Sequence, residues 1–143
     1  MKTILILLFS FVISNSCNEQ KTQDMENTIL EYEFYSRGSY NKIVMDSKTI
    51  KSFNERNLSK PSAEKKIIAT DLKIILNLYS KLNLNTIGTL KSPTQKRFYD
   101  GAAIAVLIVK TPKGNYQSSE FDHEEAPTEI KQIVDKMNQI AQN

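Results

Sequence analysis

The sequence predicts an α+β domain in which an antiparallel sheet of about five strands carries two helices packed on one face. Residues 30–53 alternate apolar and polar side chains, with turn signals between them, as half-buried strands do. Two later segments, 60–82 and 127–140, repeat their apolar residues at helical spacing. The resulting order of elements, βββαββα, is typical of helices that cover one side of an antiparallel sheet.

Three strands are expected first. Apolar Leu30, Tyr32 and Phe34 alternate with more polar neighbours, which predicts one half-buried strand. The sequence "SRGS" at 36–39 contains a glycine and small polar residues and therefore predicts a turn. Residues 40–53 then read as two strands joined by a tight turn at Asp46 and Ser47, which completes a three-stranded meander.

A first helix is expected over 60–82. Pro61 is tolerated at the start of a helix, and Ser59 or Ser62 can cap its free amides. Further apolar residues at 67, 74 and 78 widen the apolar stripe, so we expect this helix to be mostly covered. The stripe itself consists of Ile68, Leu72, Ile75, Tyr79 and Leu82.

The second half of the domain begins with a connection that contains a short strand near Phe98. The run 102–109, "AAIAVLIV", predicts a central strand with both faces covered, or with one face covered and the other in an interface. Pro112 and Gly114 predict a turn, after which 115–122 returns antiparallel. A last helix follows, with Pro127 in its first turn and a stripe of Ile130, Ile133, Val134, Met137 and Ile140.

Length, composition and charge limit the function. The chain has 143 residues, 40% of them hydrophobic and 24% charged, which suits a single folded domain. Its net charge is +3, and dispersed lysines at this charge argue against nucleic acid as a partner. The sequence has no glycine-rich phosphate loop, histidine pair, nucleophile elbow or Cys-His pair, so we expect neither a cofactor nor an enzyme.

The first seventeen residues, "MKTILILLFSFVISNSC", differ in composition from the rest of the chain. Lys2 gives a positive start, and an apolar run from Ile4 to Ile13 follows it. The run is shorter than the roughly 20 residues that a membrane-spanning helix needs. It therefore predicts an export signal that ends at Cys17, the only cysteine in the chain.

This leader resembles the lipobox of bacterial lipoproteins, in which a cysteine is acylated and the leader is cleaved before it. Ser16 fits the pattern, while Ser14 and Asn15 stand where leucine and a small residue are usual. The resemblance implies a lipid anchor at Cys17 in the membrane of the bacterial cell envelope. Asn18 after the cysteine agrees with sorting to the outer membrane in some Gram-negative bacteria. In outline the chain is similar to small lipoproteins of Bacteroidetes-type bacteria.

The domain organisation follows from this reading. Residues 1–17 are expected to be the signal peptide, residues 18–27 a flexible polar tether, and residues 28–143 one α+β domain. An acylated cysteine cannot form a disulfide. The exported domain must therefore be stabilised by its hydrophobic core alone, which is sufficient at this size.

A polar corner is predicted where the last two strands end. If residues 112–114 form the turn, residues that face each other across the hairpin have numbers that sum to about 226. Asp122 then faces Ile104 and His123 faces Ala103, which places "FDHEE" beside "RFYDG". The corner would contain Arg97, Tyr99, Asp100, Asp122, His123 and Glu124.

Two interpretations of this corner are open. Carboxylates around a single imidazole can bind a divalent metal or a ligand, or transfer a proton. Alternatively the corner is only a joint, in which Arg97 pairs with a carboxylate and Asp100 makes a turn with Gly101. In this second interpretation Asp122 and Glu124 accept hydrogen bonds from free helix amides.

The first predicted hairpin offers another candidate surface. Three tyrosines lie there beside Phe34 and Arg37, and rigid aromatic rings with arginine are common in recognition surfaces. These tyrosines are Tyr32, Tyr35 and Tyr40. Packing within the core would explain them equally well.

These observations favour a non-enzymatic, lipid-anchored envelope domain that binds a protein or a small ligand. One alternative is a metal-binding protein or metal-assisted hydrolase that uses the corner around His123. Another is a structural component of the envelope.

Overall fold

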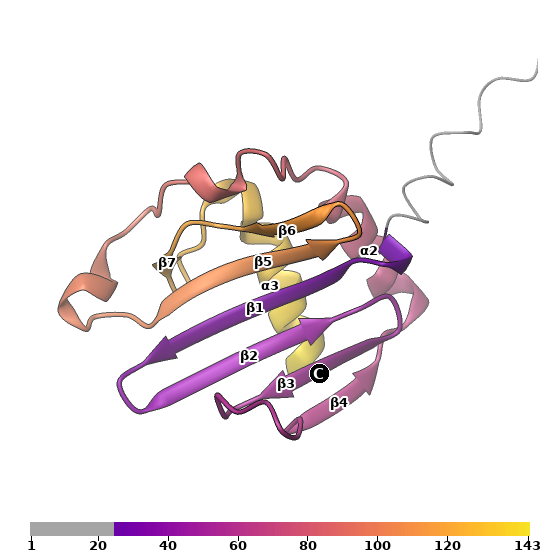
Figure 1. Ribbon diagram of the computed structural model, residues 1–143, viewed down its shortest axis with the longest axis horizontal. Helices are drawn as coiled ribbons and strands as arrows, with labels where there is room; N and C mark the ends of the chain where they lie inside the picture. Colours follow the sequence, from indigo (N-terminus) through magenta and orange to yellow (C-terminus); the bar gives the residue numbers. More distant parts are fainter. Residues whose placement is uncertain (1–24) are drawn as a thin grey trace, which may run out of the picture.

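The computed structural model describes residues 25–143 and confirms the α+β class, with more strands than expected. The strands are β1 (Ile29–Ser36), β2 (Ser39–Met45), β3 (Thr49–Phe53), β4 (Ala63–Lys66), β5 (Ile104–Thr111), β6 (Gly114–Gln117) and β7 (Phe121–Asp122). The helices are α2 (Ala69–Tyr79) and α3 (Thr128–Gln142), with short 3₁₀ helices η1 (Ile87–Thr89) and η2 (Lys96–Tyr99). All seven strands form one antiparallel sheet in the order β4-β3-β2-β1-β5-β6, and β7 also pairs with β5 (Figure 1).

The core lies between the sheet and α3, which crosses behind the strands in Figure 1. On this side of the sheet Leu30 of β1 faces Val109 of β5, and both side chains are fully buried. The predicted stripe of α3 is confirmed, because all five of its residues are buried. Pro127 directly precedes the helix, and its carbonyl oxygen accepts the amide of Lys131.

The predicted turns of the first hairpins are confirmed. Ser36 pairs with Ser39, so Arg37 and Gly38 form a two-residue turn, and Gly38 has a φ of 80° that suits glycine. Between β2 and β3, Asp46 Oδ1 accepts the amide of Thr49 at 2.6 Å. A carboxylate that bonds the backbone in this way stabilises a tight turn.

The expected helix over 60–82 is partly wrong, because α2 begins only at Ala69. Residues 63–66 instead form β4, in which Glu64 pairs with Lys51 of β3. Ser62 caps no helix and donates through its amide to the carbonyl of Ser52. Pairing with β3 satisfies the backbone groups of 63–66, and this tertiary hydrogen bonding outweighs their helical pattern.

Helix α2 is also less covered than its apolar stripe predicts. Ile75 is its only buried residue, whereas Ile68 and Ile74 are 61% and 44% exposed. The helix packs against α3, and Lys136 Nζ of α3 lies 2.7 Å from Asp71 Oδ1 at the start of α2. Contact with one helix covers only one side of α2, so the wide apolar stripe is not buried as a whole.

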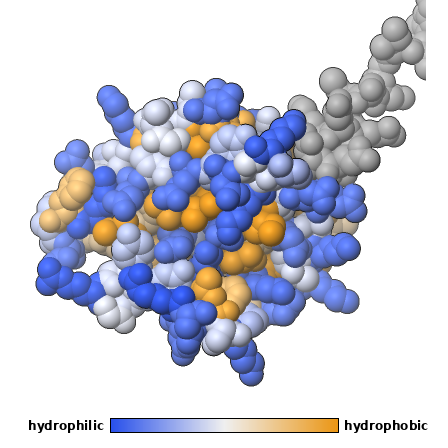
Figure 2. Space-filling view, in the orientation of Figure 1, coloured by the Kyte–Doolittle hydropathy of each residue, from blue (hydrophilic) through white to orange (hydrophobic). Residues whose placement is uncertain are grey.

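Strand β5 is central, as predicted, and lies between β1 and β6. Ala105, Leu107 and Val109 are fully buried on the α3 side. On the other side Val106 is buried, while Ile104 and Ile108 are half-buried. This front face is mostly hydrophilic, with separate apolar patches (Figure 2).

Charged side chains occupy the middle of the front face. Lys42 Nζ lies 2.8 Å from one carboxylate oxygen of Glu31, and Lys110 Nζ lies 2.5 Å from the other. Burial alone would raise the pKa of Glu31, but hydrogen bonds from both lysines hold this pKa below its ordinary value. The network therefore neutralises a buried acid on the face of the sheet that α3 does not cover.

The folded domain begins earlier than the predicted start at residue 28. Met25 is only 1% exposed and belongs to the core, although we expected it in the tether. The predicted signal peptide, Cys17 and most of the tether lie outside the described residues. Among residues 25–143, no helix is both long and apolar enough to cross a membrane.

Candidate ligand-binding site

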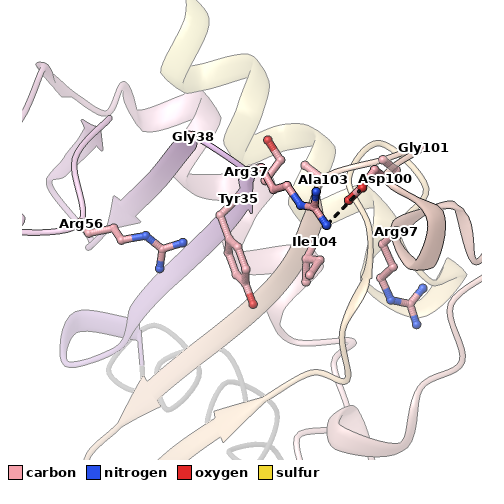
Figure 3. A pocket seen from close by; sticks show the side chains of 11 residues that line it. Tyr35, Arg37, Gly38, Arg56, Arg97, Asp100, Gly101, Ala103 and Ile104 are labelled. Atoms are coloured by element: carbon pink, nitrogen blue, oxygen red, sulfur yellow. Dashed lines mark ion pairs between the residues drawn. The ribbon is translucent and has the colours of Figure 1, made fainter.

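An open depression of about 820 Å³ lies at the turn between β1 and β2 (Figure 3). Three segments that are far apart in the sequence form it: the β1–β2 turn, the loop after β3, and the segment from η2 to the start of β5. It is lined by Tyr35, Ser36, Arg37, Gly38, Arg56, Arg97, Asp100, Gly101, Ala102, Ala103 and Ile104. We call it the arginine pocket.

All three arginines of the chain line this pocket. The sequence has 19 basic residues, and only Arg37, Arg56 and Arg97 among them are arginines. No lysine lines the pocket, and Asp100 is its only acidic residue. The pocket is therefore positively charged, and its charge comes from guanidinium groups, which bind carboxylates and phosphates through two parallel hydrogen bonds.

Arg37 and Asp100, which both line the pocket, form an ion pair (Figure 3). The distance from Arg37 Nη2 to Asp100 Oδ2 is 3.6 Å, and the two side chains are 92% and 70% exposed. Water screens so exposed and long a contact, so it contributes little stability. Arg37 is thus available to another anion at little cost.

Asp100 is placed by an unusual backbone conformation. It follows η2 with a φ of 58°, in the left-handed region that aspartate and asparagine tolerate better than most residues. Gly101 comes next, and a Cβ there would lie 2.9 Å from the ring of Tyr99. This turn agrees with the interpretation of Asp100 and Gly101 as a turn after Tyr99.

Arg56 approaches from the loop after β3 and stacks on two tyrosine rings. Its guanidinium carbon lies 5.1 Å from the centre of the Tyr35 ring and 5.2 Å from that of Tyr40. Burial and the carboxylate of Glu33 raise the pKa of Tyr40 to about 12, so its ring stays neutral. These cation–π contacts hold the guanidinium of Arg56 beside the pocket.

Arg97 has a different role from the other two arginines. Its side chain extends away from the Arg37–Asp100 pair in Figure 3, and its Nη1 donates to Asp122 Oδ1 at 3.0 Å. The side chain is only 10% exposed, and the guanidinium also stacks on Phe98. Arg97 therefore contributes mainly a fixed wall to the arginine pocket.

Asp122 holds the segment around η2 in place. Its side chain is fully buried and accepts hydrogen bonds from the hydroxyl of Thr94 and the amide of Lys96, both at 2.6 Å. The amide and guanidinium of Arg97 complete the set. Burial would raise the pKa of Asp122, but these donors lower it to about 2.

This arrangement corrects two expectations about the corner. Residues 96–99 form a 3₁₀ helix, and no strand lies near Phe98, because their amides bond to Asp122 rather than to a strand. Asp122 satisfies amides of η2, whereas we expected it to satisfy those of the last helix. The expected ion pair between Arg97 and a carboxylate is present.

The predicted register holds at the far end of the last hairpin. Asp122 faces Ile104, and the amide of His123 donates to the carbonyl of Ala103. The expected turn over 112–114 is wrong by one residue, because Gly114 belongs to β6 and pairs with Thr111. The returning strand then gains one residue between β6 and β7, and this extra residue restores the expected register. This bulge turns Phe121 into the core and Asp122 toward η2.

His123 lies on the α3 side of the sheet. Its Nδ1 is hydrogen-bonded to the hydroxyl of Tyr32 at 2.7 Å, and its ring stacks on Phe34 with centroids 3.9 Å apart. Burial lowers the pKa of His123 below its ordinary value, although the nearby Glu124 acts in the opposite direction. A neutral, stacked imidazole bonded to a buried tyrosine is well suited to packing.

The structure therefore divides the predicted corner. Arg97 and Asp122 form one pair, while Asp100 is paired with Arg37 and His123 with Tyr32. Within residues 25–143, no three side chains of the histidine, cysteine, aspartate and glutamate types gather so that they could hold a metal. The two other residues of the corner, Tyr99 and Glu124, are exposed.

The structure separates the tyrosines of the first hairpin. Tyr32 is fully buried on the α3 side, as the alternative of core packing predicts. Tyr35 pairs with Tyr40 on the opposite face, beside Arg37 in the turn. The sequence reasoning overlooked Arg56, although the rarity of arginine in a lysine-rich chain is a signal that marks all three pocket arginines.

Comparisons with known proteins add no relative. No family model matches the chain, and neither a curated protein nor a solved structure is significantly similar to it. The chemistry of the arginine pocket is therefore the best guide to function.

Proposed function

We propose that this chain is a non-enzymatic, lipid-anchored domain of the bacterial cell envelope that binds a small ligand in the arginine pocket. The observation that carries the proposal is the gathering of all three arginines of the chain around one depression. Arginines distributed without a role would not be expected to meet from three separate segments. Their meeting is characteristic of a site that recognises a ligand.

The state of the other polar groups supports binding rather than catalysis. Asp122 is buried under four hydrogen-bond donors, and His123 is engaged by Tyr32. A general base needs a free lone pair within reach of a substrate proton. Neither group lines the arginine pocket.

The position of the pocket would keep it accessible in a lipid-anchored protein. The described chain starts at the α2 end of the molecule, and β1 then runs to the hairpin turn at the opposite end (Figure 1). Eight residues of strand span about 26 Å. A lipid anchor at Cys17 would join the domain at the first end, so the arginine pocket would face away from the membrane.

A thermal-shift screen tests the binding function. The purified full chain is heated with a library of neutral, cationic and anionic small molecules, beside the Tyr35→Ala variant as a matched control. We expect at least one compound to raise the melting temperature of the wild type and not that of the variant, since the variant lacks a pocket wall. If every stabilising compound acts equally on both proteins, the pocket is not the binding site.

A further inference from the structure

We propose that the arginine pocket recognises the carboxylate or phosphate group of a small aromatic or apolar ligand, with Arg37 and Arg56 as its two anchors. This inference rests on the binding function proposed above and specifies the chemical class of the ligand.

The charge of the lining residues selects an anion. Among residues 25–143, three arginines and one aspartate line the pocket, without lysine, glutamate or histidine. Asp122 neutralises Arg97, so the charge open to a ligand comes from Arg37 and Arg56. Guanidinium groups are planar and weakly hydrated. They therefore lose less hydration free energy than an ammonium group does when they bind a carboxylate or phosphate edge-on. A cationic ligand would meet repulsion from this set of charges.

The two anchors differ in how they are held. Stacking on Tyr35 and Tyr40 orients Arg56 from one side of the pocket. Arg37 lies on the other side of Tyr35 in Figure 3, where it forms an ion pair with the exposed carboxylate of Asp100. An incoming anion can replace Asp100 as the partner of Arg37.

The remaining lining residues suit an apolar or aromatic body behind the anionic group. Ala102, Ala103 and Ile104 provide small and apolar side chains beside the ring of Tyr35. The volume of about 820 Å³ lies within the range of pockets that hold small organic ligands. Such sites usually combine apolar walls with a few polar groups that set orientation.

Asp100 acts in this arrangement as a competitor of the ligand. It supplies the only negative charge among the lining residues and contacts Arg37. Asp100→Asn removes that charge, and asparagine tolerates the left-handed backbone at this position. The substitution should therefore strengthen anion binding without unfolding the turn.

Nuclear magnetic resonance of the arginine side chains tests the inference on the full chain in a non-ionic detergent. The sequence has only three arginines, so three Nε–Hε signals are expected, and arginine-to-lysine variants assign them. Benzoate and phenyl phosphate are the anionic probes, and benzamide is the neutral counterpart of benzoate. We expect both anions to shift the signals of Arg37 and Arg56, while benzamide leaves both in place.

Variants give the second readout. Arg37→Gln and Arg56→Gln should each raise the dissociation constant of phenyl phosphate about tenfold, since a charge-assisted hydrogen bond is lost. Asp100→Asn should lower this dissociation constant. The control Lys113→Gln removes the same charge at the β5–β6 turn and should leave it unchanged, because this lysine does not line the pocket.

The inference and the proposed function can fail separately. A compound whose binding needs Tyr35 but neither Arg37 nor Arg56 would overturn the anionic assignment and leave the binding function standing. Equal shifts with benzamide and benzoate would overturn it as well. Anion binding that Lys113→Gln weakens as much as Arg56→Gln would show general charge attraction and would also overturn it.

Discussion

Asp122 is the residue on which the geometry of the arginine pocket most depends. Its carboxylate ties the turn before η2, the first amides of η2 and the side chain of Arg97 to β7. These segments include the pocket wall that ends at Asp100 and Gly101. A single buried carboxylate thus positions residues that themselves lie at the surface.

Asp122→Asn should destabilise the domain by roughly 3–5 kcal/mol, because it leaves the guanidinium of Arg97 buried without its counter-ion. The backbone N–H of Lys96 donates to Asp122 Oδ2 in the wild type. In the variant, the side-chain NH₂ of asparagine can face this N–H, so that two donors meet. Equilibrium unfolding in guanidinium chloride measures the loss. Asp100→Asn is the matched control and should change stability by about 0–1 kcal/mol, since its ion pair is exposed.

Acid should destabilise the domain through the same residue. The pKa of Asp122 falls from 3.8 when unfolded to about 2 when folded. Its contribution to stability is complete above pH 3.8 and is lost as the pH falls through 2, because the unfolded state takes up the proton first. Between pH 5 and pH 2, the free energy of unfolding should therefore depend less steeply on pH for Asp122→Asn than for the wild type. An unchanged pH dependence would contradict the low pKa.

His123 should give a second, separate pH dependence. Its folded pKa lies below 6.5, so protonation favours the unfolded state, and stability should fall as the pH drops below about 6.5. His123 is the only histidine in the chain, which makes the assignment direct. Unfolding free energies at pH 7.5 and pH 5.5 should differ for the wild type and agree closely for His123→Gln. A slope retained in the variant would assign the effect to other groups.

At the scale of elements, α2 shows how tertiary contacts choose among apolar residues that follow one another. Ile74 and Ile75 are identical side chains at neighbouring positions, yet Ile75 is fully buried and Ile74 is 44% exposed. Contact with α3 determines the difference, because it covers one side of the helix only.

Ile75→Ala should therefore cost roughly 2–5 kcal/mol, as buried large-to-small substitutions do. Ile74→Ala, its matched control, should stay within about 1 kcal/mol, because little of its burial is lost and alanine favours helices. Ile133→Ala in α3 should resemble Ile75→Ala. Thermal and chemical unfolding of the three variants measure the difference. Equal losses of stability for Ile74→Ala and Ile75→Ala would contradict the packing of α2 on α3 through Ile75.

At the scale of the whole molecule, the start of the described chain at Met25 and the arginine pocket lie at opposite ends. An anionic membrane surface repels an anionic ligand only within a Debye length, about 8 Å at physiological salt. The strand β1 alone separates the two ends by about 26 Å. The membrane should therefore not disturb binding in the pocket.

Acylation at Cys17 can be tested by detergent partitioning of cells that express the chain. The wild type should enter the detergent phase and incorporate radiolabelled palmitate, whereas Cys17→Ser should do neither, since the variant lacks the sulfur that is acylated. Palmitate incorporation into both proteins would rule out the lipoprotein hypothesis.

The orientation predicts equal affinity on anionic and on neutral membranes. Phenyl phosphate should bind the acylated protein on vesicles with 30% anionic lipid, and on neutral vesicles, with dissociation constants within about twofold of each other. Titration calorimetry on both vesicle types measures this. A much weaker affinity on the anionic vesicles would place the pocket near the membrane.

Local patterns determined much of the fold. The stripe of α3 is a property of helical spacing, and the turns at Arg37–Gly38 and Asp46 depend on the chemistry of a few adjacent residues. Each of these features depends on residues close in sequence, so the sequence alone was sufficient to predict them. The register that pairs Asp122 with Ile104 is different, because the bulge between β6 and β7 offsets a turn that is one residue shorter than expected.

Only the tertiary structure decided which distant segments meet. Residues 63–66 became a strand because β3 offered hydrogen-bond partners, and Tyr32 was buried because α3 covers its side of the sheet. The arginine pocket joins the β1–β2 turn, the loop after β3 and the end of η2. No periodicity records such a meeting, because it depends on long-range pairing and on a buried carboxylate, Asp122, that aligns η2 with the sheet.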